Sequence, residues 1–500
     1  MKINKNILVA VSAVVLVIVI LVINNIISRP ETAIDYPVYT DYSPNPPTIT
    51  ENDSTLPDHP EENIVEIIED NPAPLDETAP YIDTPVPYVI QGKFPSLHIT
   101  SSYDPFGVDR SFWHSGTLSL SNHINAFEDV DIRIRGRGNS TWHFGPDKRP
   151  LRLRFEEPQP LANAEHIARD WVLIANHFDL ALMRTHLAFY LASLLDGMYW
   201  APFSQFVNLY INGEYMGLYQ LADERDIGPG RAQLVADPDP AVSEYFFELD
   251  HSAIGSGQVG VDYLIVNGMP YSLRYPGSGV IDGHMEYLHD FVANVEYILH
   301  THDFEAISQV VDIPSFIDFY LVQELFKNVD VGFNSVFMQV KGQGENRRLY
   351  FGPVWDFDRS AGNMYYWYTY EHLHAGVRNN LFRPLISTPE IFDLVAVRWE
   401  EISGNQVPQM IEYIMNLAEN YDTNFMRNFE RHPIWESDPL PQWMTQMLPP
   451  HLHQIDNWHG QVEFLLEWFE GRVWWMNQFF IADEDLRAWW INYIFHGYGG

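Results

Sequence analysis

The 500-residue sequence contains no cysteine, and it has only 29 Lys and Arg residues against 67 Asp and Glu residues. The absence of cysteine excludes disulfides, thiol nucleophiles, iron–sulfur clusters and cysteine-ligated zinc together. The shortage of positive charge gives a formal net charge of -38, which argues against nucleic acid or an anionic lipid surface as the main partner. A basic partner or substrate would be attracted instead.

Positive charge is missing altogether between Arg29 and Lys93, where Pro, Thr, Asp and Glu prevail. A segment of this composition repels itself and buries too little apolar surface to offset its ordering entropy. We therefore expect residues 29–92 to form an acidic, proline-rich, disordered linker.

A nearly unbroken apolar run, from Ile7 to Ile23, precedes the linker and follows Lys2 and Lys5. Its length is close to the roughly 20 residues that a helix needs to cross a bilayer. No small-residue cleavage pattern follows it, so we interpret residues 1–28 as an uncleaved transmembrane signal anchor. The charge asymmetry around the run predicts that the C-terminal body lies outside the cytoplasm, anchored by this single helix.

The composition is typical of one globular domain from residue 93 to residue 500. Its first third is predicted to be rich in strands, because several segments alternate apolar and polar side chains. These segments are residues 95–101, 116–122, 130–136 and 149–155. Asn212-Gly213, centred between two further alternating runs, predicts a hairpin.

Helical spacing of apolar residues dominates the second half of the domain, in residues 284–300 and 312–328, and is also present earlier, from Leu180 to Leu194. Asp312 is expected to cap the second of these helices, with Pro314 in its first turn. We expect an α+β fold in which a strand-rich first lobe and a helical second lobe enclose a cleft.

Residues 135–142, RGRGNSTW, form the first of four stretches that are polar where the surrounding pattern would continue a strand or core segment. The glycines allow the backbone to approach a ligand closely, and the polar side chains are donors that suit a phosphate. These donors are Arg135, Arg137, Asn139, Ser140 and Thr141. A glycine-rich turn with exposed arginines is the alternative for this stretch taken alone.

Lys148 lies just ahead of the predicted strand 149–155, where an exposed ammonium group can offer a point charge to a phosphate. A solvated surface lysine is the alternative.

Asp330 and Asn334 follow the predicted helix 312–328. A carboxylate that accepts the substrate proton and an amide that binds metal divide the work in this way in kinase catalytic loops. Two polar loop residues that cap a turn are again the alternative.

Asp356 and Asp358 stand one residue apart in the stretch WDFD. We expect a strand ending at Trp355 to deliver both carboxylates to one side, as oxygen ligands of a hard cation. Trp355 and Phe357 would then point the opposite way, into apolar packing. A capped turn is the alternative for the pair alone, but in this order the four stretches supply the parts of a metal-dependent phosphoryl-transfer site.

Five blocks of the sequence resemble the signature blocks of the CotH family, the spore-coat-protein-H-like atypical protein kinases. They are RIRGRGNSTW, KRPLRLRF, YINGEYMGLYQL, ELFKNVDVGFNSVFM and FGPVWDFDRSAGN, within residues 95–480. The resemblance implies a kinase-like bilobal fold over residues 93–500 that binds ATP with Mg²⁺ or Mn²⁺ and phosphorylates proteins on Ser or Thr. The sequence departs from the family pattern in its thinned basic tract, Lys148-Arg149, and in Leu151, where the family has tyrosine.

The resemblance also implies roles for individual residues. Lys148 would act in catalysis by contacting the nucleotide phosphates, and Asp330 would be the catalytic carboxylate. Asn334 and Asp356 would bind the metal, with Asp358 as a second candidate. Glu224 matches a glutamate that recurs after the hairpin and would lie at a hinge near the nucleotide, beside the donors of the glycine-rich stretch.

The expected partners are protein substrates of the cell surface or spore coat, basic ones included, together with the membrane through the N-terminal helix. The main alternative is a non-catalytic surface or spore-coat scaffold or adhesion protein that keeps a kinase-like fold. Histidines at positions 372, 374, 451, 453 and 459 raise a metallohydrolase as a further alternative, although no carboxylate motif accompanies them. The tryptophans of residues 458–480 would suit a carbohydrate surface, but their helical spacing favours core packing.

Overall fold

The computed structural model describes residues 94–482, except residues 105–106, 108–109, 139, 146–147, 278–282, 365–368, 438–440, 442–443 and 446–447. All described residues belong to one compact unit. The predicted anchor, residues 1–28, and the predicted linker, residues 29–92, lie outside the described residues and stay predictions. None of the helices that the structure describes has the length and apolar character that crossing a membrane requires.

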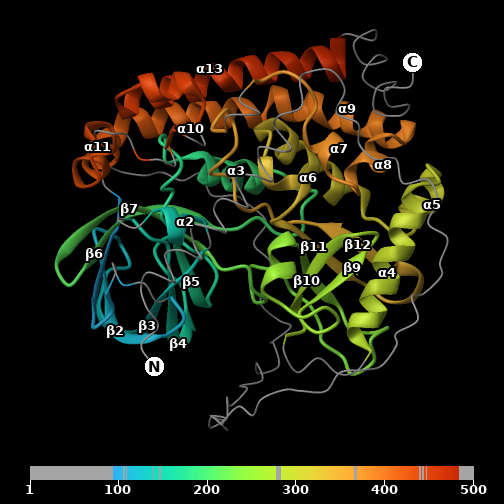
Figure 1. Ribbon diagram of the computed structural model, residues 1–500, viewed down its shortest axis with the longest axis horizontal. Coiled ribbons are helices and arrows are strands. Elements are labelled where there is room, and N and C mark those ends of the chain that lie inside the picture. The colour runs from blue at the N-terminus through green and yellow to red at the C-terminus, as the bar shows by residue number, and fades with distance from the viewer. Residues whose placement is uncertain are drawn as a thin grey trace, which may run out of the picture. The chain divides into compact units, whose positions relative to one another are not determined.

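The N-terminal part of the described chain is a closed barrel with the strand order β1-β2-β3-β4-β5-β7-β6, shown in blue to green in Figure 1. Its strands are β1 Ser96–Ser101, β2 His114–Ser121, β3 Phe127–Gly136, β4 Leu151–Gln159, β5 Ala168–Ile174, β6 Ser204–Ile211 and β7 Glu214–Asp223. The four segments predicted as strands are confirmed as β1 to β4. Their apolar side chains, among them Leu97, Ile134 and Leu153, fill the barrel interior. Closure leaves these strands no free edge.

The predicted hairpin is confirmed, because β6 and β7 pair as antiparallel neighbours across Asn212-Gly213. Both turn residues have positive φ, 52° for Asn212 and 84° for Gly213. Asn and Gly adopt this left-handed conformation at little cost, which is why the dipeptide marks two-residue hairpins.

The prediction of a helix from Leu180 is wrong at its start, since helix α3 spans only Arg184–Ser193. The Asp179 carboxylate accepts hydrogen bonds from the backbone N–H groups of Ala181 and Arg184, at 3.0 and 2.7 Å. Short side-chain-to-backbone bonds of this kind compete with helical hydrogen bonds, so the chain makes a turn before α3 begins.

A second sheet, which the prediction of a mainly helical second lobe missed, has the strand order β12-β11-β8-β10-β9. Its strands are β8 Tyr245–Leu249, β9 Tyr263–Val266, β10 Met269–Tyr275, β11 Val336–Lys341 and β12 Arg348–Phe351. All five residues of β8 are buried. A short strand covered on both faces shows no alternation of apolar and polar residues, and this alternation was the signal used to predict strands.

The helices of the second half lie around this sheet and beyond it. They are α4 His284–Leu299, α5 Phe304–Ser308, α6 Ile313–Phe326, α7 Ala375–Arg378, α8 Phe382–Ile386, α9 Pro389–Gly404, α10 Gln406–Asn420, α11 Asp422–Arg431 and α13 Trp458–Asn477. A five-residue helix, α2 Ser140–Phe144, lies between β3 and β4. Single helical turns complete the described elements, namely η1 His251–Gly255, η2 Val329–Gly332, η3 Gly344–Asn346, η4 Ile434–Glu436, η5 Pro450–Gln454 and the π-turn η6 Gln478–Ala482.

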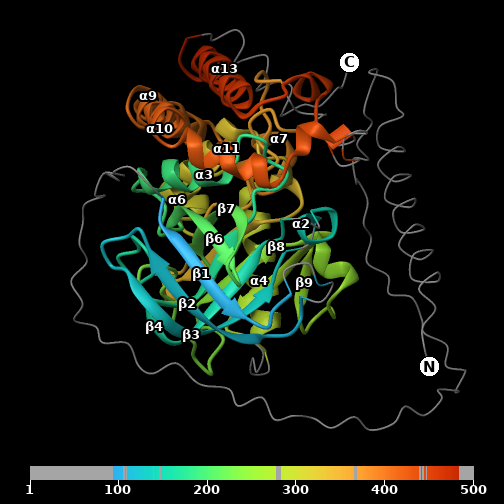
Figure 2. The same cartoon turned by 90° about the vertical axis from the view of Figure 1, so that its left-hand side faces the viewer.

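The predicted helices over residues 284–300 and 312–328 are confirmed as α4 and α6. The Asp312 carboxylate accepts a hydrogen bond from the Ser315 N–H, so its predicted capping role is confirmed as well. Every residue of α6 except Pro314 is buried, which makes α6 the central helix rather than one with a single apolar face. Figures 1 and 2 show α9, α10 and α13 side by side, and α6 and α3 pack against this layer.

Candidate active site

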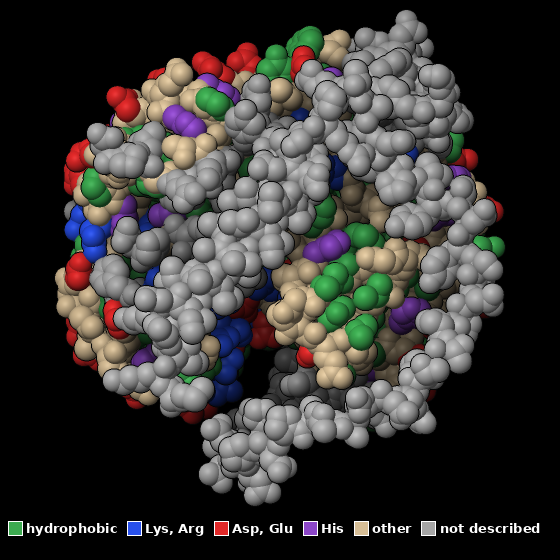
Figure 3. Space-filling view, in the orientation of Figure 1, with side chains coloured by type: hydrophobic (Ala, Val, Ile, Leu, Met, Phe, Trp, Pro, Cys, Tyr) green, Lys and Arg blue, Asp and Glu red, His purple; other side chains and the backbone are tan. Residues whose placement is uncertain are grey.

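A cavity of about 1170 Å³ opens between the barrel and the second sheet. Its walls come from the ends of β3 and β4, the segment after β7, the end of β8 with η1, and the residues that follow α6 and β12. Figure 3 shows a hollow in this region of the molecule. The cleft that was predicted between the lobes is therefore present, with one wall formed by the second sheet.

Three carboxylates, those of Asp330, Asp356 and Asp358, line this cavity together with the amide of Asn334. Burial raises the pKa of Asp330 to about 6, with Asp356 adding to the rise and Arg359 opposing it. Burial also raises the pKa of Asp358 well above its ordinary value, and the negative charge of Asp356 contributes next. The three carboxylates thus interact electrostatically, as charged groups that share one site do.

The WDFD stretch lies beyond the sheet and not at a strand end, because β12 ends at Phe351. The prediction of a strand ending at Trp355 is therefore wrong, and Asp356 has φ 65°, a left-handed conformation that no extended strand allows. The predicted alternation is nevertheless observed, since Trp355 is 4% and Phe357 0% exposed while Asp356 is exposed to the cavity.

Two aromatic contacts fix the direction of the carboxylates. Phe357 packs edge-on against Phe326 of α6, with ring centroids 5.4 Å apart. Trp355 packs against Phe189 of α3, with centroids 5.2 Å apart. Because both rings are held in the core, the side chains between and after them are directed to the cavity.

Asp330 lies in η2, directly after α6. The helix ends at Lys327, which has φ 47°, and the Asn328 side chain accepts a hydrogen bond from the Asp330 N–H at 3.2 Å. The Asp330 carbonyl in turn accepts the Asn334 N–H at 2.9 Å, so the turn that positions the carboxylate also positions the amide. The Asn334 Oδ1 accepts the His251 N–H at 2.9 Å, which ties the turn to η1.

The donor set fits Mg²⁺ or Mn²⁺ when a phosphate completes the coordination. Among the described residues, no group of three or more His, Cys, Asp or Glu side chains could hold a metal ion by itself. Mg²⁺ in phosphoryl-transfer sites is held by one or two carboxylates plus substrate phosphates rather than by an all-protein cage. Carboxylates that raise one another's pKa lack a nearby positive charge that would stabilise their ionised form. A cation bound between them would supply that charge.

The glycine-rich stretch forms the opposite wall of the cavity. Arg135, Arg137, Gly138 and Ser140 all line it, as does Thr141, whereas Asn139 lies outside the described residues. The Arg137 guanidinium lies 5.8 Å from the centre of the Trp355 ring, near the carboxylates, and burial lowers the pKa of Arg137 to about 10.

The glycines of this stretch act differently from the prediction that both allow close approach to a ligand. A Cβ on Gly136 would lie 2.2 Å from the Trp142 ring, so this glycine makes room for an aromatic side chain. Gly138 has φ 85° and turns the chain at the cavity wall.

Glu224 lines the cavity just after β7, where a hinge residue was predicted. Burial alone would raise the pKa of Glu224, but the guanidinium groups of Arg152, Arg225 and Arg137 outweigh it and lower the pKa to about 2. Glu224 is therefore ionised and interacts electrostatically with the arginines of this wall.

Arg225 is a site residue that sequence reasoning missed. Its guanidinium lies 5.0 Å from the centre of the Trp355 ring and 5.3 Å from that of Phe337. Burial lowers the pKa of Arg225, but the charges of Glu224, Glu248 and Asp356 outweigh burial, and the pKa is raised. Arg225 thus lies on the wall beside Trp355 together with Arg137. The charged run ERD, directly after an apolar strand, was the signal that could have found it.

Lys148 does not line the cavity. The lysine is 2% exposed, its Nζ has no hydrogen-bond partner among the described residues, and it lies 5.2 Å from the centre of the Tyr219 ring. Burial lowers the pKa of Lys148 to about 7, against the opposing effect of Asp179. The expectation of an exposed lysine is therefore wrong. The predicted contact of Lys148 with the nucleotide phosphates stays a prediction.

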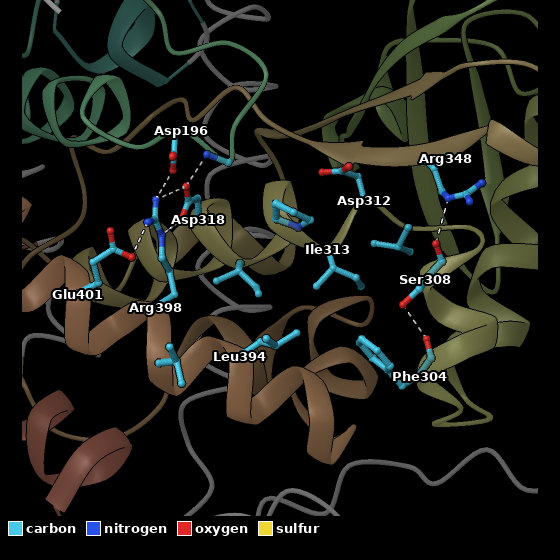
Figure 4. Close-up of a pocket in the computed structure, with 15 residues that line it drawn as sticks. Asp196, Phe304, Ser308, Asp312, Ile313, Asp318, Arg348, Leu394, Arg398 and Glu401 are labelled. Atoms are coloured by element: carbon cyan, nitrogen blue, oxygen red, sulfur yellow. Dashed lines mark hydrogen bonds and ion pairs between the residues drawn. The ribbon is translucent and has the colours of Figure 1, made fainter.

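A second cavity, of about 620 Å³, lies between α5, α6 and α9 (Figure 4). None of the predicted site residues lines it. Its Arg398 is already paired with Asp196, Asp318 and Glu401, at 2.6 to 2.8 Å. The charge of Arg398 is thus offset within the wall of this cavity.

The two minor alternatives gain no support from the described residues. His374 and His453 contact the carbonyls of Asn328 and Met444, as polar loop histidines do. Trp458, Trp468 and Trp475 are buried in the core, which confirms the prediction of core packing for these three tryptophans, but Trp474 is 57% exposed, so the prediction is wrong there.

The family model described as CotH kinase protein matches residues 132–476, from β3 to the last turn of α13. This match covers more than half of the chain, so the chain belongs to the CotH kinase protein family, whose domain is kinase-like. No curated protein matches the chain.

Proposed function

We propose that the protein is a metal-dependent protein kinase that transfers the γ-phosphoryl group of ATP to Ser or Thr residues of surface or spore-coat proteins. One observation carries this proposal. Asp330, Asp356 and Asp358 share a cavity with Asn334, and arginines of the barrel face them across it. A site with clustered carboxylates on one wall and guanidinium groups on the other suits a metal nucleotide and its phosphates.

Asp330 would accept the proton of the substrate hydroxyl. The hydroxyl oxygen forms a bond to the γ-phosphorus, and the bond from the γ-phosphorus to the bridging oxygen breaks, with its electron pair leaving on ADP. A pKa of about 6 keeps Asp330 largely ionised at neutral pH yet basic enough to take the proton.

Asp356, with Asp358 and Asn334, would hold a divalent cation that screens the charge of the β- and γ-phosphates. Arg137 and Arg225 lie beside Trp355, near Asp356, where fixed positive charge favours the negative charge of the transferred group. These residues need no rearrangement of charge during the reaction, because burial and ion pairs already fix them.

The predicted N-terminal anchor would place this catalytic domain on the outer side of a membrane, close to surface or coat proteins. The net charge of -38 favours basic protein substrates. Both statements rest on the sequence.

The test is transfer of label from [γ-³²P]ATP, by the full-length chain in detergent, to itself or to a basic protein. We expect transfer that requires Mg²⁺ or Mn²⁺, stops with a chelator and is lost in Asp330→Asn. A wild-type chain that binds surface or coat proteins but transfers no label under any metal would establish the scaffold alternative.

A further inference from the structure

Four arginines face one another across two strands of the barrel, and three of them, Arg135, Arg152 and Arg154, line the cavity. Arg133 pairs in register with Arg154, and Arg135 pairs with Arg152, across β3 and β4. Like charges directly opposite on neighbouring strands destabilise a sheet. Their concentration here, in a chain with a net charge of -38, therefore needs either counter-ions or a ligand to explain it.

Counter-ions account for only two of the four. Arg154 makes a forked pair with Asp170, at 2.7 and 2.9 Å, and Arg152 contacts the same Asp170 at 3.2 Å and Glu224 at 3.4 Å. Neither Arg133 nor Arg135 forms an ion pair with any residue that the structure describes. This wall thus carries positive charge that the described chain does not neutralise.

The Arg135 side chain has a hydrogen-bond donor that a bound anion would satisfy. Its Nε is buried and has no hydrogen-bond partner among the described residues. Burial lowers the pKa of Arg135, and the positive charge of Arg152 contributes next. A buried donor without a partner costs free energy that a bound oxygen would recover.

Trp113 holds three of these guanidinium groups together. Arg135 and Arg154 each lie 4.8 Å from the centre of its ring, and Arg133 lies 6.0 Å from it. A guanidinium stacked on an indole keeps its edge free for a planar, two-point contact with an oxyanion. Phosphate is the group that such a fork recognises best.

Among the charges that act most on Arg135, those of the three proposed site aspartates are absent, although Glu224 and Arg152 act on both Arg135 and Arg137. Arg137 feels the charge of Asp356, whereas the charges that act on Arg135 are those of Arg152, Glu224, Arg154 and Asp170. Figure 3 shows basic side chains gathered beside the hollow. The cavity, at about 1170 Å³, also exceeds the range of roughly 300 to 1,000 Å³ that single small ligands occupy.

We propose that Arg133, Arg135 and Trp113 form a second anion subsite beside the cavity, where Arg135 lines the cavity and Trp113 and Arg133 adjoin Arg135. It takes a phosphoserine or phosphothreonine side chain already present on the protein substrate. The inference rests on the proposed function only in calling the bound peptide a substrate. A phosphate placed in this subsite would direct a neighbouring hydroxyl of the same peptide to Asp330, so one phosphorylated position would favour the next.

The test is fluorescence anisotropy of the full-length chain with a labelled Gly-Ser peptide that carries one phosphoserine, against the same peptide without phosphate. We expect the phosphopeptide to bind at least about tenfold more tightly, the scale of one charge-assisted hydrogen bond. Arg133→Ala and Trp113→Ala should each remove that preference. Arg169→Ala is the matched control, because Arg169 donates to the Phe155 carbonyl on the neighbouring strand and is not one of the guanidinium groups over the Trp113 ring.

Nucleotide phosphates are the other source of the same chemistry, so the assay is repeated with saturating ADP and Mg²⁺. Retention of the phosphopeptide supports a separate subsite, whereas its displacement would assign the arginines to the nucleotide and overturn the inference. Equal binding of the two peptides, or unchanged binding in Arg133→Ala, would also overturn it. Phosphopeptide binding in a chain that transfers no label would leave this inference standing and refute only the proposed kinase activity.

Discussion

At the scale of single residues, the charged form of Asp358 opposes folding, and a cation in the proposed site would relieve this cost. Its pKa is raised first by burial and then by Asp356, which means that its charged form is disfavoured in the folded chain. A carboxyl with a raised folded-state pKa contributes stability below its unfolded pKa and loses it as pH rises through the folded value. Asp330 behaves in the same way between about pH 4 and 6.

We therefore predict that Asp358→Asn raises the melting temperature of the metal-free protein at pH 7, because it removes one of three mutually repelling carboxylates. The gain should shrink as pH falls, when the wild-type carboxyl is protonated and neutral as well. The same variant should lose the stabilisation that Mg²⁺ with ATP gives the wild type. Thermal melts across this pH range measure both, and a variant less stable than wild type at pH 7 would contradict the account.

Lys148 gives a second prediction of this kind. A lysine with a lowered folded-state pKa of about 7 destabilises the protein fully below that pH, and the penalty disappears as pH rises toward 10. Lys148→Met keeps the volume and removes the buried charge, so its melting temperature should exceed that of wild type at pH 7 and approach it near pH 10.

Isothermal titration with ADP and Mg²⁺ on the same Lys148→Met protein tests the predicted phosphate contact. Weakened nucleotide binding would keep Lys148 in the site, despite its place against Tyr219. Unchanged nucleotide affinity would remove it from the set of site residues.

At the scale of elements, one buried ion pair holds the central helix to the outer layer. Arg472 of α13 contacts Glu324 of α6 at 2.7 Å, and both side chains are 0% exposed. The Glu324 carboxylate also accepts the backbone N–H groups of His374 and Gly376. These hydrogen bonds thus hold the segment that follows the WDFD stretch against α6, close to the turn that contains Asp330.

We predict that Arg472→Met lowers the free energy of unfolding by about 3–5 kcal/mol, because it leaves the Glu324 carboxylate buried without its counter-charge. Arg431→Met is the control, since the pair of Arg431 with Glu214 is largely exposed and worth at most about 1 kcal/mol. Chemical denaturation measures both. A similar cost in the two variants would mean that the buried pair has no special role.

Elements whose signals are local were predictable from the sequence. Strands β1 to β4 alternate, Asn212-Gly213 specifies its turn by backbone conformation, and α6 carries its own cap at Asp312. The second sheet was not predictable in this way, because its strands are short and β8, among them, is buried on both faces and owes its place to tertiary packing.

The same distinction applies to the site. Asp330, Asp356 and Asp358 could be proposed from their order along the chain, and the structure brings them to one cavity. The run ERD could have drawn attention to Arg225 but not shown its role, because that role depends on Trp355, which reaches Arg225 only through the fold. Burial of Lys148 was equally hidden, since it depends on a barrel that closes around Tyr219.

At the scale of the whole molecule, the chain is acidic overall, but several of its arginines lie together on the cavity wall. This is where the proposed function would require positive charge to bind phosphate. The barrel contributes Arg135 and Arg137 to one wall, and the segments after α6 and β12 contribute the carboxylates to the other. Arg184 of α3 joins the two sides, because its guanidinium pairs with Asp179 and donates to the Ala361 carbonyl at 3.2 and 3.1 Å. The separation between the walls is therefore set by the fold before any ligand binds.

The central claim, that these walls bind a metal nucleotide for phosphoryl transfer, is tested most directly with Asp356→Asn. Label transfer from [γ-³²P]ATP and the melting-temperature shift caused by Mg²⁺ with ATP are measured on the same full-length preparation, beside wild type. The account predicts a loss of transfer of at least about a hundredfold, on the scale of one preorganised electrostatic group, and no ligand-induced shift. Full transfer with an unchanged shift would show that Asp356 and Asp358 only cap a turn, and would contradict the account.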